Sequence, residues 1–92
     1  MKLLEAVVRE MEIGVLVIDS EENILFMNPF FKDSFLIRET TSVITVADII
    51  RDHTLLEAIE KTLRSKDNNP EKVTMEGKNG EILEVRLVHF VE

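Results

Sequence analysis

The sequence predicts a single α+β domain. Its 92 residues suffice for one hydrophobic core but not for two. Segments with apolar residues at helical spacing alternate with short runs rich in β-branched residues. Hydrophobic residues make up 45% and charged residues 32% of the chain, which is the balance of a folded globular protein rather than a disordered one. We therefore take residues 1–92 as one domain.

Two kinds of element are predicted near the N-terminus. Residues 2–11 have the pattern of an amphipathic helix. The apolar side of this helix comprises Leu3, Leu4, Val7, Val8 and Met11. Residues 13–19 are apolar on both parities, as expected of a central strand covered on both faces. Four polar residues then lead to a second strand at 24–27, which predicts an antiparallel hairpin.

A short helix is predicted to follow the hairpin. Asn28 can cap free backbone N–H groups, and Pro29 loses no hydrogen bond in a first helical turn. Phe31 and Phe35, four residues apart, form the buried side of this helix. Residues 37–45 show no clear period and predict an irregular connection.

The longest helix is predicted over residues 53–66. Residues 46–50 form one helical turn before it, and Asp52 is a suitable N-cap. Its apolar face comprises Leu55, Leu56, Ile59 and Leu63. Four residues that include Pro70 end the helix.

Two strands joined by a tight turn are predicted at the C-terminus. Residues 72–76 alternate as a half-buried strand does, and 77–80 hold residues that tolerate a positive φ. Residues 81–91 form the second strand. One face carries Leu83, Val85, Leu87, His89 and Val91, and the other carries Ile82, Glu84, Arg86, Val88 and Phe90. The apolar residues on this outward face predict contact with another element or another chain.

Charge and composition exclude several functions. Eleven Lys and Arg against eighteen Asp and Glu give a net charge of −7, which opposes binding to nucleic acid or to a membrane surface. The absence of cysteine excludes disulfides, thiolate metal sites and thiol nucleophiles. No apolar run is long enough to span a membrane, so we expect a cytoplasmic domain whose parent protein could still be membrane-anchored.

The segment GVLVIDSEENILFMNPFF resembles the opening of a PAS domain, in particular those of sensor histidine kinases of the phosphate-regulation type. The matching residues are Gly14, Asp19, Ile24, Asn28 and Pro29. ADIIRDHTLLEAIEKTL is similar to the long helix of that family, and GKNGEILEVRLV to its hairpin. The resemblance implies an antiparallel sheet with helices on one face, a core over 13–92, and an N-terminal signalling helix at 2–11.

Two features depart from the family pattern. The glycine that commonly follows the short aromatic helix is replaced by the run Phe35, Leu36, Ile37. The final strand of the family is missing, and in a PAS sheet that strand lies between the strands expected at 13–19 and 81–91. The resemblance therefore implies that the chain is a truncated fragment lacking this strand, or that another chain or a shifted strand fills the gap in the sheet.

By resemblance, this domain is a bacterial sensory and dimerisation module of a two-component signal-transducing histidine kinase. It would form a homodimer through helix 2–11 and pass a conformational change to the kinase domain of the same chain. A PAS module of a transcription regulator or of a cyclic-dinucleotide enzyme would have the same sequence features. No catalytic motif is present, so the domain itself is expected not to be an enzyme.

A ligand pocket is the main alternative. Candidate lining residues are Phe31, Phe35, Leu56, Ile59, Leu87 and His89. Because the five phenylalanines are needed for the core, a small or absent cavity and no cofactor are expected. Haem or a small acid bound near His53 or His89 stays open as an alternative, as does a small hydrolase with an Asp–His pair. Asp48, Asp52 and His53 are a weak metal pattern, and no metal is expected.

Overall fold

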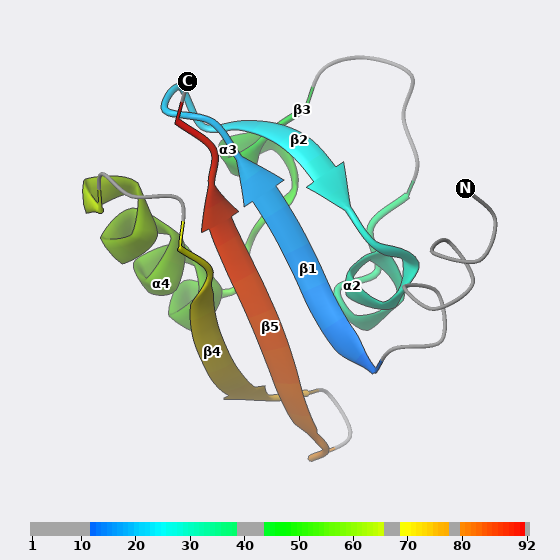
Figure 1. Cartoon of the computed structure of the whole chain (residues 1–92). Helices are drawn as coiled ribbons and strands as arrows, with labels where there is room; N and C mark the ends of the chain where they lie inside the picture. The colour runs from blue at the N-terminus through cyan, green and yellow to red at the C-terminus, as the bar shows by residue number, and fades with distance from the viewer. Residues whose placement is uncertain (1–11, 39–43, 66–68, 78–79, 92) are drawn as a thin grey trace, which may run out of the picture.

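The computed structural model describes residues 12–38, 44–65, 69–77 and 80–91. Eight elements follow in chain order (Figure 1): β1 (Ile13–Ile18), β2 (Asn23–Met27), α2 (Pro29–Ser34), β3 (Ile44–Thr45), α3 (Val46–Ile49), α4 (His53–Arg64), β4 (Glu71–Glu76) and β5 (Ile82–His89). The predicted α+β class is confirmed. The predicted helix 2–11, with Leu3, Leu4, Val7, Val8 and Met11, lies outside the described residues.

The five strands form one mixed sheet in the order β3-β2-β1-β5-β4. β1 and β5 are parallel neighbours, paired from Ile13 with Glu84 to Ile18 with His89. The expected antiparallel sheet with a gap between these strands is therefore wrong. The chain crosses over between β1 and β5 through the helices and β4, so the two strands run in the same direction. The inner residues of β5 then match those of β1, and the two strands pair directly.

The helices lie on one face of the sheet, which we call the inner face (Figure 1). Leu16 and Ile18 of β1 and Leu87 of β5 are fully buried there. Phe31 of α2 and Leu55 of α4 complete the core with them. Sequence alternation predicted these strand faces correctly, because residues two apart point to the same side of a sheet.

Close packing of α2 on β1 favours glycine at position 14. A Cβ at Gly14 would lie 3.2 Å from Cδ2 of Phe31, which is tighter than ordinary van der Waals contact. Phe31 is fully buried, and its ring centroid lies 4.7 Å from that of Phe35. A side chain at position 14 would therefore require the Phe31 ring to shift by a few tenths of an ångström.

Local signals placed most element ends correctly. The side chains of Asn28 and Asp52 cap α2 and α4 as predicted, and each accepts a backbone N–H three residues later at 3.0 Å. α4 ends at Arg64, two residues before the predicted end, and β5 ends at His89 rather than at residue 91. Two residues of the stretch expected to be irregular form the edge strand β3, which pairs with Asn23 and Ile24 of β2.

The other face of the sheet carries a group of apolar side chains. Val15 and Val17 of β1 and Val88 of β5 are half-buried, whereas Phe26 and Phe90 are 47% and 45% exposed. We call these five residues the outer patch. No described residue covers them as the helices cover the inner face, so β1 is not enclosed on both faces within the described chain.

Candidate functional site

Five of the six predicted pocket residues belong to the core rather than to a cavity. Phe31, Ile59 and Leu87 are buried at 0–2% exposure, and Leu56 packs at the edge of the same cluster. Phe35 lines a cavity among the described residues, and the other five are absent from the lining of that cavity. The aromatic pair Phe31–Phe35 therefore spans the boundary between core and cavity.

His89 is buried, as its position on the inner face of β5 predicted, but it does not line a cavity. Its Nδ1 lies 3.0 Å from the carbonyl oxygen of Ser65, and its Nε2 lies 2.9 Å from the hydroxyl of Ser20. Because the carbonyl can only accept, Nδ1 carries a hydrogen, and in the neutral ring Nε2 accepts from Ser20. His89 thus joins the end of β5 to the end of α4 and to the β1–β2 turn.

His53 has a different environment. Its side chain is 86% exposed on the first turn of α4, and Nε2 lies 2.9 Å from a carboxylate oxygen of Glu57. It is not one of the residues that line the cavity described below. The described residues hold no group of three His, Asp or Glu side chains that could bind a metal ion.

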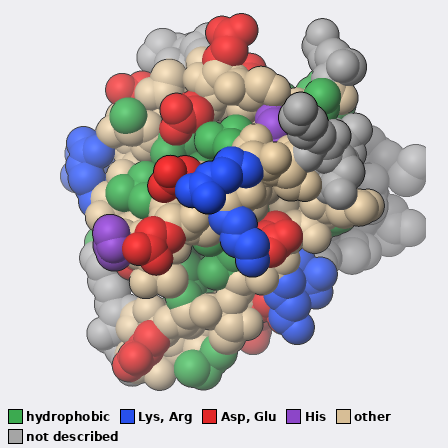
Figure 2. All heavy atoms as spheres, turned by 90° about the vertical axis from the view of Figure 1, so that its left-hand side faces the viewer, with side chains coloured by type: hydrophobic (Ala, Val, Ile, Leu, Met, Phe, Trp, Pro, Cys, Tyr) green, Lys and Arg blue, Asp and Glu red, His purple; other side chains and the backbone are tan. Residues whose placement is uncertain are grey.

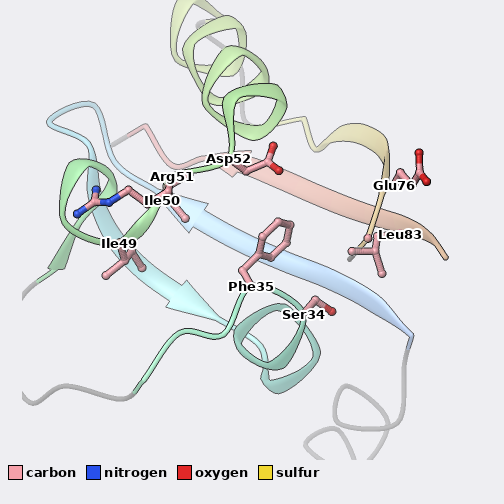
Figure 3. A pocket seen from close by; sticks show the side chains of 9 residues that line it. Ser34, Phe35, Ile49, Ile50, Arg51, Asp52, Glu76 and Leu83 are labelled. Atoms are coloured by element: carbon pink, nitrogen blue, oxygen red, sulfur yellow. The ribbon is translucent and has the colours of Figure 1, made fainter. Parts of the chain in front are cut away.

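One candidate site is a cavity of about 340 Å³ between α2, the α3–α4 junction and the β4–β5 hairpin (Figure 3). We call it the junction cavity. It is lined by Ser34, Phe35, Ile49, Ile50, Arg51, Asp52, Glu76, Gly77 and Leu83. Its volume lies at the lower end of the range of small-molecule sites.

Apolar side chains form the floor of the junction cavity. Phe35 points into it from the end of α2, and Leu83 and Ile50 lie around the ring (Figure 3). Leu83 and Ile50 are 5% and 3% exposed, so the floor is continuous with the core. Such a surface can hold an apolar group away from water.

Polar residues form the rim of the junction cavity. Asp52 caps α4 through Oδ1, which accepts from the Leu55 N–H, and its second carboxylate oxygen is not needed for that bond. Glu76 belongs to the lining at the end of β4, but its side chain lies on the outer face of the sheet, because Glu76 pairs with the outward-facing Ile82 and its neighbour Met75 is buried. Arg51 points away from Phe35 toward α3 (Figure 3), where its guanidinium donates to the carbonyl oxygens of Ala47 and Asp48 at 2.7 and 3.4 Å.

The charged part of the outer sheet face is internally paired. Glu84 of β5 accepts from Arg86 at 2.8 Å and lies 3.3 Å from Nζ of Lys72. The hydrogen bond from Arg86, followed by that from Lys72, lowers the pKa of Glu84 against the opposing effect of desolvation. Figure 2, which faces the α4 and β4 side, shows Lys and Arg interleaved with Asp and Glu. This side therefore presents no patch of one charge sign.

Asp19 stabilises the turn between β1 and β2 by accepting hydrogen bonds from other residues of the turn. Asp19 accepts hydrogen bonds from the Asn23 side chain and from the backbone N–H groups of Asn23 and Glu21. These bonds, with the Asn23 side chain first, lower the pKa of Asp19. Each bond lies within the turn, which gives Asp19 a structural role.

The residues missed in the sequence are those that only tertiary structure brings together. Asp52 was recognised as a helix cap, yet nothing in its local pattern placed it beside a cavity that is also lined by Leu83, which follows 31 residues later.

No helix among the described residues is both long and apolar enough to cross a membrane. Comparison with protein-family models, curated proteins and solved structures found no significant match to this chain.

Proposed function

We propose that this chain is a non-catalytic signalling module that dimerises through the outer face of its sheet. One observation carries the proposal: the two central strands are covered by helices on the inner face, whereas the outer patch is apolar and its two phenylalanines are exposed. Soluble monomers rarely leave a contiguous apolar surface over their central strands. Such a surface is typical of a protein-binding site.

The sequence supports a second copy of the chain as the partner. The segment 2–11, which is predicted to be an amphipathic helix, directly precedes β1. Such a helix would end next to the start of this central strand. Two such helices can pair with each other, and two outer patches can bury each other across a twofold axis. Both surfaces belong to every copy, as a homodimer requires.

The resemblance of Gly14, Asp19, Ile24, Asn28 and Pro29 to a PAS domain suggests the cellular role. We infer a cytoplasmic sensory module of a bacterial two-component histidine kinase. In this proposal, a change in the sheet alters how two copies pair and so changes the activity of a downstream kinase domain. The buried contacts of Asn28 with β1 and α2 are consistent with its place in this motif.

Sedimentation velocity of the full chain over a range of concentrations tests the interface. We expect a dimer in the wild type and a monomer in Phe26→Glu and Phe90→Glu, because each substitution places a charge in the outer patch. Leu36→Glu is the matched control, since Leu36 is 68% exposed at the end of α2, outside the patch. A wild type that stays monomeric, or a control that dissociates equally, would contradict the proposal.

A further inference from the structure

We propose that Ser20 is a nucleophilic serine, activated by His89, that accepts an acyl group from a neutral activated ester. The end of β5 lies beside the β1–β2 turn (Figure 1), and the Ser20 hydroxyl lies 2.9 Å from Nε2 of His89. At this distance an imidazole can take the proton of an attacking hydroxyl. Ser20 is exposed, whereas His89 is buried. The fold therefore places an accessible nucleophile in direct contact with a buried base.

The other ring nitrogen of His89 holds the base in the required form. Nδ1 donates to the Ser65 carbonyl at 3.0 Å, so the neutral ring presents the lone pair of Nε2 to Ser20. A base that contacts the nucleophile through one nitrogen and an orienting group through the other is the arrangement of an activated serine. Three segments far apart in the chain thus supply the nucleophile, the base and the group that orients the base.

Asp19 supplies a negative charge near the base. The hydrogen bond from the Asn23 side chain is the largest cause of the lowered pKa of Asp19, and the charge of the His89 ring is a smaller one. Because this attraction exists only when the imidazole is protonated, the Asp19 carboxylate favours the imidazolium form. Proton transfer from Ser20 to His89 would be assisted in the same sense.

Ser20 lies at the edge of a hollow that suits a short apolar acyl group. The hollow has a volume of about 430 Å³. It is lined by Asp19, Ser20, Glu21, Leu25, Phe90 and Val91. Leu25 and Phe90 are large exposed hydrophobic residues that can hold the acyl chain. The acidic residues Asp19, Glu21 and Glu22 surround Ser20 in the sequence and disfavour an anionic acyl donor.

The proposed reaction is a single acyl transfer. Oγ of Ser20 bonds to the carbonyl carbon of the ester, the bond from that carbon to the leaving oxygen breaks, and the Ser20 proton passes through Nε2 of His89 to the leaving group. The next three backbone N–H groups after Ser20 already donate to Asp19, so they do not form an oxyanion hole. Hydrolysis of the acyl-serine would need such donors again. We therefore expect a lasting modification of Ser20 rather than rapid turnover.

This modification does not depend on the proposed dimer. Phe90 belongs both to the hollow and to the outer patch, but the reacting groups all come from one copy of the chain. A chain that stays monomeric in sedimentation would contradict the proposed function and leave the acylation of Ser20 unaffected.

Reaction of the full chain with p-nitrophenyl acetate, followed by mass spectrometry of its peptides, tests the site. We expect a burst of p-nitrophenolate and an acetyl group on Ser20. Ser20→Ala should abolish the burst. Ser34→Ala is the matched control, because Ser34 lies in α2 outside the hollow, and it should react as the wild type does. A burst that persists in Ser20→Ala, or acetyl groups on lysine alone, would overturn the proposal.

Two further measurements show whether His89 activates Ser20. His89→Gln keeps a polar side chain but removes the base, and it should slow acetylation of Ser20 by about a hundredfold or more. Circular dichroism checks that this variant is folded. If it is unfolded, heavy water decides with the wild type, because transfer of the Ser20 proton in the slow step makes acetylation slower there. Equal rates in folded His89→Gln, or no slowing in heavy water, would show that Ser20 is an ordinary hydroxyl.

Discussion

Asn28 and Val15 are joined by two hydrogen bonds: the Asn28 backbone N–H donates to the Val15 carbonyl at 3.1 Å, and the Val15 N–H donates to the Asn28 side-chain oxygen at 2.9 Å. The Asn28 side chain also donates to the Ile13 carbonyl at 2.7 Å and caps α2 at Phe31. This one fully buried amide therefore continues the pairing of β1 beyond the end of β2 and starts the next helix.

Asn28→Ala should lower the free energy of unfolding by about 3 kcal/mol, because it removes the cap and leaves buried groups of β1 without partners. Asn28→Ser should lower it by about 2 kcal/mol, since serine can still cap α2 but is too short to pair with β1. Urea unfolding measures both. Asp52→Ala removes a cap alone and should cost about 1 kcal/mol. If Asn28→Ala costs no more than this control, the strand contacts do not contribute.

The two histidines should differ sharply in their contribution to stability. His89→Leu removes both hydrogen bonds of a buried ring and should cost about 2 kcal/mol, because the Ser65 carbonyl and the Ser20 hydroxyl each lose one hydrogen bond. His53→Leu changes an exposed residue and should shift stability by no more than about 0.5 kcal/mol. Thermal unfolding followed by circular dichroism compares them. Similar losses in the two variants would show that the His89 contacts do not stabilise the fold.

Stability should fall in acid because three carboxyl groups have lowered pKa values. Hydrogen bonds from Asn23, Thr45 and Arg86 are the largest causes for Asp19, Asp48 and Glu84, respectively. Below their ordinary values of 3.8 for Asp and 4.5 for Glu, the unfolded chain binds more protons than the folded chain. Their contribution is therefore complete above these values and is lost as the pH falls through the lower folded values.

Urea midpoints at pH 6 and pH 3 measure this loss. The triple variant Asp19→Asn, Asp48→Asn, Glu84→Gln should show a smaller difference between the two pH values than the wild type. A control with Glu57→Gln and Glu60→Gln removes two exposed carboxylates of α4 and should keep the wild-type difference. An equally steep loss in the triple variant would assign the acid sensitivity to other groups.

Leu36→Gly should stabilise the chain relative to Leu36→Ala by about 1 kcal/mol. Leu36 has φ +54°, a left-handed conformation that costs a residue with a Cβ about 1 kcal/mol or more but costs glycine almost nothing. The next N–H, of Ile37, donates to the Lys32 carbonyl at 2.8 Å, as in a glycine-ended helix. Alanine is the proper reference because both variants remove the exposed leucine side chain. Equal urea midpoints for the two variants would show that this backbone position is unstrained.

The sequence by itself determined the elements whose signals are local. Asn28 and Asp52 marked two helix starts because an N-cap needs only a side-chain oxygen next to free N–H groups. Alternation from Leu83 to His89 assigned the inner face of β5, since a strand has a period of two residues. A glycine commonly follows the short helix in the family that the sequence resembles, and a local backbone requirement explains this preference. Leu36 occupies that left-handed position in this chain.

Tertiary structure alone decided which distant segments meet. Nothing local in β1 or β5 specifies that they pair in parallel, because each strand has the same backbone donors and acceptors in either direction. The partners of His89 lie 24 and 69 residues away in the chain, and Asp52 lines the same cavity as Leu83 from another element. These relationships depend on how the helices carry the chain from the β3 edge of the sheet to the β4 edge. That path is set by the packing of the whole core.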